Sequence, residues 1–179
     1  MIPLRNNFPE LYTGYMKTKK TALLGLVLAY AMILSYIESM IPFFFGVPGM
    51  KLGLPNMAIV FLLYLYGEKE AILINVLRIV LTGLLFGSMF GIMFSIAGAV
   101  ISFITMSIVK KSDILDVRGV SICGGVAHNI GQLLIAAFLV KTSGIMYYLP
   151  VLLIAGSLCG FINGFIAVSM MKYSKLLKA

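Results

Sequence analysis

Long apolar runs that contain almost no charged residues recur along this 179-residue chain, and they limit its fold more than any motif does. Each run approaches the length needed to cross a bilayer as a helix, which is about 20 residues. Hydrophobic residues make up 61% of the chain and charged residues 11%, whereas soluble domains average about 25% charged residues. A soluble fold of this size could not bury so much apolar surface. The sequence therefore predicts a polytopic membrane protein.

Six runs, separated by proline, glycine and charge clusters, predict six membrane-spanning helices, because lipid offers no partner for an unpaired backbone group. The expected fold is an all-α six-helix bundle. The second run is short unless the preceding "KLGL" enters the bilayer, and the third and fourth are separated only by glycine. The predicted spans are Thr21–Met40, Pro55–Tyr66, Lys69–Phe86, Gly87–Val109, Val120–Val140 and Pro150–Met171.

The flanks of these spans predict both the domain organisation and the orientation. Residues 1–20 form a cytoplasmic N-terminal segment, 21–172 the transmembrane domain, and 173–179 a cytoplasmic basic tail. With both termini in the cytoplasm of a multi-pass cell-membrane protein, only Lys51 and Lys141 face outward, as the positive-inside rule expects. The net charge of +8 is then an orientation signal and a contact for anionic membrane lipid, not a sign of nucleic-acid binding. The basic residues expected inside are Arg5, Lys17, Lys19, Lys20, Lys69, Lys110, Lys111, Arg118, Lys172, Lys175 and Lys178.

Small residues recur at every fourth position in three of the runs, a pattern that lets helix backbones approach closely. In the fourth and sixth runs we expect packing within the bundle. In the first run, a docking surface for another membrane protein competes with that reading. The three stripes are Gly87, Gly91, Ser95 and Ala99; Gly156, Gly160 and Gly164; and Thr21, Gly25 and Ala29.

Polar side chains at membrane depth are costly and need a reason. They could floor a cavity that opens outward beneath the loop "PFFFGVPGMKLGLPN". They could equally satisfy one another as interhelical hydrogen bonds, and one sequence does not show which faces converge. The residues are Glu38 near the outer end of the first span, Asn75 and Arg78 in the third, His128, Asn129 and Gln132 in the fifth, and Asn163 in the sixth.

Several of these residues lie in motifs that resemble a known family. The stretches "ESMIPFFFGVPGMKLGLPN" and "GVSICGGVAHNIGQ", with Gly67, "KEA" and Arg78 between them, resemble the Gx transporter family. That family is traditionally labelled heptaprenyl diphosphate synthase component I and is similar to the substrate-binding S components of energy-coupling factor (ECF) transporters. Pro55 departs from the pattern, which has a small residue there.

The resemblance implies a six-helix subunit that captures a small molecule from outside. An ECF-type membrane scaffold and two ATPase subunits would be its partners, and Thr21, Gly25 and Ala29 would be the docking face. The substrate-binding candidates that match the family's motifs are Lys51, Asn56, Arg78, His128, Asn129 and Gln132. The cations Lys51 and Arg78 outnumber the carboxylate of Glu38, which favours an anionic or polar ligand. The substrate itself is not identified.

Catalysis by this chain is not expected. Prenyl synthases hold Mg²⁺ with clustered aspartates, whereas this chain has two, Asp113 and Asp116, in a charged cytoplasmic loop. Cys123 and Cys159 lie within spans without a partner spacing, so we infer neither a disulfide nor a metal site. No cofactor is expected. Two alternatives to uptake stay open: a membrane accessory of isoprenoid or quinone biosynthesis, and a structural partner without a ligand.

Overall fold

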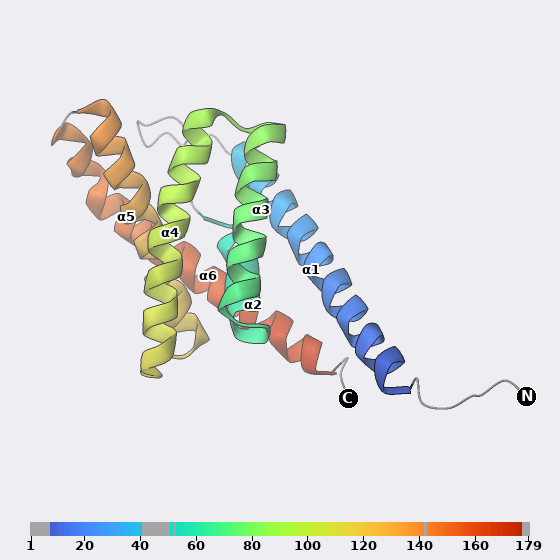
Figure 1. Cartoon of the computed structure of the whole chain (residues 1–179). Helices are drawn as coiled ribbons and strands as arrows, with labels where there is room; N and C mark the ends of the chain where they lie inside the picture. Colours follow the sequence, from blue (N-terminus) through green and yellow to red (C-terminus); the bar gives the residue numbers. More distant parts are fainter. Residues whose placement is uncertain (1–7, 41–50, 52, 142, 177–179) are drawn as a thin grey trace, which may run out of the picture.

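The computed structural model describes residues 8–40, 51, 53–141 and 143–176, and every regular element in these ranges is helical (Figure 1). The helices follow the six predicted runs closely. A short 3₁₀ helix, η1, precedes the last of them. The elements are α1 (Phe8–Met40), α2 (Asn56–Leu65), α3 (Glu68–Phe86), α4 (Met89–Ser112), α5 (Val117–Val140), η1 (Ser143–Tyr148) and α6 (Leu149–Leu176).

The protein is a membrane protein by the length and composition of its helices. Four described stretches are long and apolar enough to cross a bilayer: Lys17–Met40, Met89–Ser112, Val117–Leu139 and Gly144–Tyr173. The helix α2 has only 10 residues, or about 15 Å at 1.5 Å per residue. The 19 residues of α3 include Glu68, Lys69, Glu70 and Arg78. The structure therefore supports four spans directly, and the count of six stays a prediction.

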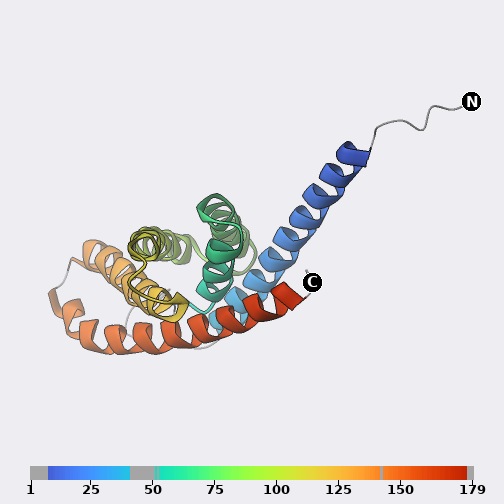
Figure 2. The ribbon, with the colours of Figure 1, turned by 90° about the horizontal axis from the view of Figure 1, so that it is seen from below.

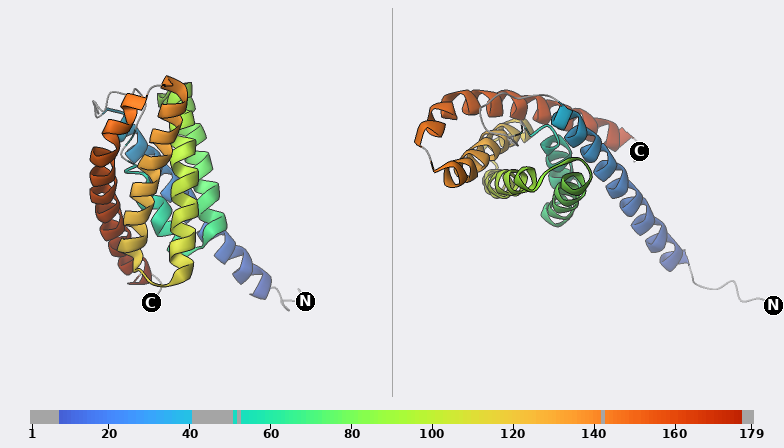
Figure 3. Two further views of the ribbon diagram at one scale, coloured as in Figure 1. Left: turned by 90° about the vertical axis from the view of Figure 1, so that its left-hand side faces the viewer. Right: turned by 90° about the horizontal axis from the view of Figure 1, so that it is seen from above.

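The short helix α2 lies at the centre of the bundle. It contacts α1, α3, α5 and α6, and all residues from Asn56 to Leu63 are buried. Figure 2 shows α6 curving around one side of the molecule while α1 points away from the other helices. The two views of Figure 3 show α3, α4, α5 and α6 side by side around α2. A central position explains why α2 is apolar on every face and yet too short to meet lipid on both sides.

Glycines bring α5 and α6 into backbone contact. A Cβ atom on Gly160 would lie 2.6 Å from the carbonyl oxygen of Ser121, and one on Gly125 would lie 2.3 Å from that of Gly156. The Ser121 hydroxyl donates a hydrogen bond of 2.7 Å to the carbonyl of Gly160. The stripe Gly156, Gly160 and Gly164 is buried. The predicted packing role of this stripe is confirmed.

Three residues of the stripe predicted for the fourth helix, Gly91, Ser95 and Ala99, are buried in α4, as packing within the bundle requires. Gly87 is exposed and caps the end of α3, outside α4. The closest approach of α4 to α5 is instead at Gly131, where a Cβ atom would lie 2.7 Å from the carbonyl oxygen of Ala97. Gly98 faces the ring of His128 in the same contact. The row of α4 that faces α5 is Gly98, Ser102 and Met106, one residue away from the predicted row, because His128 lies against Gly98 and Gly124 lies against Ser102 and Met106.

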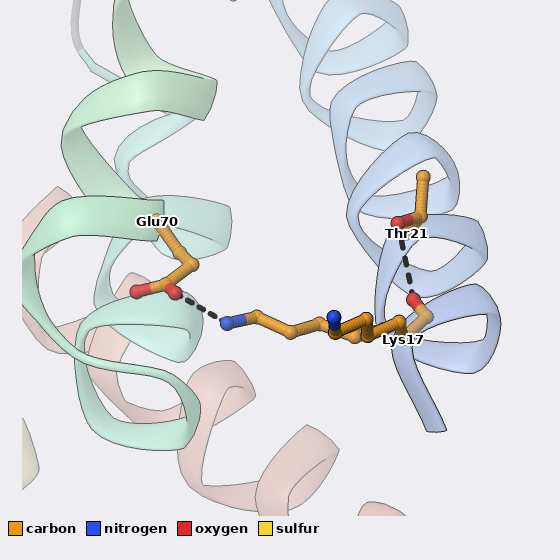
Figure 4. Close-up of polar contacts among 4 residues, drawn as sticks. Lys17, Thr21 and Glu70 are labelled. Atoms are coloured by element: carbon orange, nitrogen blue, oxygen red, sulfur yellow. Dashed lines mark hydrogen bonds and ion pairs between the residues drawn. The ribbon is translucent and has the colours of Figure 1, made fainter. Parts of the chain in front are cut away.

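Basic side chains connect the helices at one end of the bundle. Lys20 of α1 forms an ion pair with Glu70 at the start of α3, close to Thr21 (Figure 4). Lys111 at the end of α4 pairs with Glu68 at 2.9 Å. Lys110 donates a hydrogen bond of 2.6 Å to the carbonyl of Leu63. These contacts gather residues predicted to be cytoplasmic at a common end.

Candidate functional site

Lys51 and residues 53–55, which we call the segment, come from the predicted "KLGL" stretch and are held in the bundle by side chains from three helices. On one side, the carboxylate of Glu38 in α1 is 3% exposed. Its Oε1 accepts hydrogen bonds from the backbone N–H of Gly53 at 2.5 Å and of Leu54 at 3.2 Å. A buried carboxylate thus satisfies two donors that the adjacent helix α2 does not use.

The other side of the segment is bound to α5 and α6. The backbone N–H of Lys51 donates to Gln132 Oε1 at 3.1 Å. Asn163 Nδ2 donates to the carbonyl of Gly53 at 3.0 Å. Non-helical backbone is tolerated at membrane depth only where protein buries it, and these bonds provide that burial. Whether "KLGL" also enters the bilayer, as the sequence suggested for a short second run, stays a prediction.

Gly53 is required by its conformation and by its surroundings. Its φ is +87°, a value that residues with a Cβ atom rarely adopt. A Cβ atom there would lie 2.9 Å from Asn56 Nδ2 and 3.1 Å from His128 Cδ2. The segment can therefore approach the His128 ring only because this position is glycine.

His128 and Gln132 form one hydrogen-bonded unit on a face of α5. Gln132 is fully buried, and its Oε1 accepts from Lys51, so its Nε2 donates to His128 Nε2 at 3.1 Å. His128 Nε2 is then an acceptor, which places the proton of a neutral imidazole on Nδ1. That nitrogen faces Gly98 of α4, where a Cβ atom would lie 2.7 Å from it. The ring is thereby fixed between α4 and the segment.

Arg78, a cationic residue in the middle of α3, is only 3% exposed. Its NH1 donates to Ser35 Oγ of α1 at 3.2 Å and its NH2 to Asn75 Oδ1 at 2.7 Å. The two ion pairs of the described ranges, Lys20–Glu70 and Lys111–Glu68, do not include this guanidinium. Its hydrogen bonds therefore go to neutral acceptors. A buried cation without a bonded carboxylate is costly, and it supplies positive charge to the site.

Lys51 adds a second positive charge at the edge of the site. Burial lowers the pKa of its ammonium below the ordinary value, Glu38 raises that pKa in part, and Arg78 lowers it further. A buried ammonium is stabilised by a nearby negative charge. The site therefore holds two cationic side chains and one carboxylate that already binds backbone.

Four buried polar atoms around this site have no hydrogen-bond partner among the described residues: Asn56 Nδ2, Asn163 Oδ1, Arg78 Nε and His128 Nδ1. The first two belong to amides that flank Gly53. An unsatisfied buried polar atom costs about 1–3 kcal/mol. Such atoms are normally satisfied by water or by a ligand. The cluster therefore has unused capacity to bind a polar group.

The structure separates the predicted site residues into two groups. Asn56, His128 and Gln132 gather around the segment that contains Lys51. Arg78 is hydrogen-bonded to Ser35 and Asn75 instead. Asn129 does not join them, because its Nδ2 donates to the carbonyl of Leu152 in α6 at 2.8 Å. This bond connects α5 to α6, so in the described geometry Asn129 acts as an interhelical hydrogen-bonding residue, the alternative to a ligand-binding role.

Two residues of the cluster were missing from the predicted binding set. Glu38 and Asn163 were recognised as polar residues at depth, but their contacts with Gly53 were not foreseen. Their isolation within apolar runs was the available signal. In the described part of the chain, no group of three His, Cys, Asp or Glu side chains is suited to hold a metal ion.

Comparison with known proteins gives one match. No curated protein and no solved structure matches the chain. A family model described as heptaprenyl diphosphate synthase component I matches residues 27–170. These residues run from the second half of α1 into the last third of α6 and include the whole polar cluster. The chain therefore belongs to the heptaprenyl diphosphate synthase component I family.

Proposed function

We propose that this protein is the substrate-binding membrane subunit of an uptake system, similar to an S component of an ECF transporter. The observation that carries the proposal is the cluster of unpartnered buried polar atoms beside Gly53. Purely structural hydrogen bonding would leave few such atoms, since each costs stability. A ligand seated there would satisfy them. Lys51, Asn56, Arg78, His128 and Gln132 are the proposed binding residues.

The charges of the cluster favour a small anionic ligand. Among the described residues, Glu38 is the carboxylate that opposes Lys51 and Arg78, and its Oε1 is engaged by the segment backbone. An anion would offset the burial of both cations. An amide at Asn56 and the amide of Asn163 could then bind neutral polar groups of the same molecule.

Energy for uptake has to come from partner subunits in this proposal. The sequence contains no phosphate-binding GxxxxGK(S/T) motif. The proposed docking face for a membrane scaffold is the stripe of Thr21, Gly25 and Ala29, all of which are exposed. A Cβ atom on Gly25 would meet no heavy atom within 4 Å. This face of α1 is free of intramolecular packing, as a docking surface requires.

The proposed topology has six spans with both termini in the cytoplasm of the cell. The ion pairs of Lys20 and Lys111 with Glu70 and Glu68 would lie at the inner membrane surface. The segment at Gly53 would lie beneath the outer surface. A ligand from outside would therefore reach the polar cluster without passing the basic end.

Native mass spectrometry of the gently solubilised protein, purified from its own host, tests the proposal. Co-purification of a membrane scaffold with ATPases, together with an added small-molecule mass, is the expected result. Asn56→Ala and His128→Ala should lose that mass and remain folded. Asn129→Ala is the matched control, because it breaks the bond to Leu152 and should reduce stability while retaining the ligand. Partners without any ligand mass would indicate a structural subunit and refute the binding role.

A second candidate function is a membrane accessory of prenyl diphosphate synthesis. The family description favours it, and so does an apolar groove between α3 and α4. Asp113 and Asp116 act at helix ends here: Asp113 caps α4, and Asp116 Oδ1 accepts from Gly119 N–H at 2.9 Å. Catalysis would then belong to a soluble partner. Recovery of a soluble prenyl synthase in place of the ATPases would establish this function and refute uptake.

A further inference from the structure

The two backbone donors that Glu38 binds belong to the first turn of α2. The chain turns helically from Gly53 onward, because the carbonyls of residues 53–55 accept from the N–H groups three residues later at 3.0, 3.3 and 3.1 Å. The N–H groups of Gly53 and Leu54 come before these bonds and donate to Glu38. The first N–H groups of a helix carry partial positive charge and bind anions. We call the place where they meet the Glu38 carboxylate the anion position.

Buried amides beside the anion position have polar atoms without partners among the described residues. Asn56 is 5% exposed, and its unpartnered Nδ2 would lie 2.9 Å from a Cβ atom on Gly53. Asn163 is 2% exposed, and it binds the Gly53 carbonyl through Nδ2 while its Oδ1 is unpartnered. Such atoms are normally satisfied by water or by a ligand. Glu38 thus satisfies the backbone at this position but not the amides around it.

Two cations act on the anion position without pairing with Glu38. Both Arg78 and Lys51 interact electrostatically with its carboxylate. Among the described residues neither of them forms an ion pair with it, and the Arg78 guanidinium binds Ser35 and Asn75. One carboxylate therefore stands against two positive charges. The field at this position favours the approach of an anion even while Glu38 fills it.

The helix that carries Glu38 has few neighbours. Within the described ranges α1 contacts α2 and α3 and none of the later helices. Ser35 and Glu38 bond its outer half to Arg78 and to the start of α2. The next residues along the helix, Ser39 and Met40, are exposed. Withdrawal of Glu38 would therefore require movement of one helix end only, and the contact between α5 and α6 would stay closed.

We propose that Glu38 is an internal substitute for a carboxylate of the ligand. Glu38 fills the anion position, and the carboxylate of the incoming ligand displaces it and binds the N–H groups of Gly53 and Leu54. The inference rests on the proposed uptake function, because it assigns where the charged group of that ligand binds. Asn56 and Asn163 then bind the neutral part of the same molecule. Ligand binding and withdrawal of Glu38 are one exchange, so Glu38 lowers the affinity of the site and closes it.

Rescue of Glu38→Ala by acetate tests this proposal. The substitution removes the terminal CH₂–COO⁻ group, which acetate replaces in size and charge. Acetate at ten times its Kd should raise the folded-to-unfolded ratio of this variant about tenfold, measured by titration with a denaturing detergent. Acetamide has the same shape without the charge and should have little effect. Wild type and Ser39→Ala in the same acetate control for ionic strength. An acetate effect no larger than in the wild type, or an equal effect of acetamide, would overturn the proposal.

Glu38→Gln provides the test if the alanine variant does not fold. Its amide oxygen still accepts from both N–H groups, but a neutral occupant is displaced more easily than a carboxylate. Acetate binding is then followed directly by saturation-transfer NMR. A position that its internal occupant leaves free one tenth of the time binds about tenfold more weakly than an empty one. We expect an affinity for acetate at least about tenfold higher in Glu38→Gln than in the wild type. Equal affinities would show that Glu38 does not compete for the position.

The surrounding charge gives an independent readout. In the Glu38→Ala background, Lys51→Gln should weaken the rescue by acetate several-fold. Lys69→Gln removes an exposed charge at the basic end of the bundle and is the matched control. Equal rescue in the two double variants would overturn the assignment. These measurements need neither the ligand nor partner subunits, so native mass spectrometry decides the proposed function separately. A co-purified ligand without any acetate rescue would refute this inference alone.

Discussion

Replacing Glu38 by alanine is expected to destabilise the protein through two backbone donors. The carboxylate accepts from the buried N–H of Gly53 and from the partly buried N–H of Leu54. A buried donor left without a partner costs about 1–3 kcal/mol. Two such donors, one of them partly accessible, give an expected loss of about 2–5 kcal/mol in the free energy of unfolding.

The comparison with glutamine separates the acceptor oxygen from the charge. Glu38→Gln keeps an oxygen at the same distance from the backbone and loses only the charge assistance of the hydrogen bonds, so it should cost about 1 kcal/mol. Unfolding free energies can be measured by titrating the protein in mild micelles with a denaturing detergent. Ser39→Ala is the control, because the Ser39 side chain is exposed and bonds only within its own helix, to Tyr36.

Two outcomes would refute this reasoning. If Glu38→Ala were as stable as Ser39→Ala, the two N–H groups would have to find water or other acceptors at no cost. If Glu38→Gln were as damaging as Glu38→Ala, the negative charge rather than the acceptor oxygen would hold the segment. In that case attraction to Arg78 or Lys51 would be the principal interaction of this carboxylate.

Three further predictions concern the helix contacts and the charge of the site. Gly160→Ala forces a Cβ atom against the backbone of Ser121, so the same titration should show a loss of about 2 kcal/mol or more, and unchanged stability would contradict the packing. Gly25→Ala enters open space; it should keep stability but reduce co-purification of a membrane scaffold, and undiminished recovery of that scaffold would exclude this face as the docking site. Because burial lowers the pKa of Lys51, binding of an anionic ligand should weaken as pH rises through that pKa. Lys51→Arg should flatten the calorimetric pH profile, and an equal slope in both proteins would assign the titration to another group.

The sequence predicted the helices well because hydrophobic length and punctuation determine them. The glycine boundary between the third and fourth runs was correct, since only Gly87 and Ser88 separate α3 from α4. The first predicted span, Thr21–Met40, lies within the described membrane-length stretch Lys17–Met40, but the helix itself extends further toward the N-terminus. In the structure α1 begins at Phe8. A helix can continue past the membrane surface through charged residues, here Lys17, Lys19 and Lys20. Hydrophobicity gives no signal for that extension.

The candidate site was predictable in composition but not in contacts. Polar residues within apolar runs were visible in the sequence, yet neighbours on one helix point in different directions. His128 faces Gly53 and Asn129 faces Leu152, although the two residues are adjacent. The convergence of Glu38 and Asn163 on one glycine depends on helix crossing angles. Those angles are set by close contacts such as Gly160 against Ser121, which need the whole bundle to be assembled.

The central helix α2 also has a consequence for biosynthesis. The segment that precedes it bonds to Gln132 and Asn163, which lie 81 and 110 residues later in the chain than their partners Lys51 and Gly53. A nascent chain that has not yet produced α5 and α6 lacks these partners for its unpaired backbone groups. We expect α2 to reach its final position only after α5 and α6 have been made, although it is the second helix to be translated. Ribosome-bound fragments that end before α6 should leave this segment accessible to a water-soluble thiol reagent at an engineered cysteine.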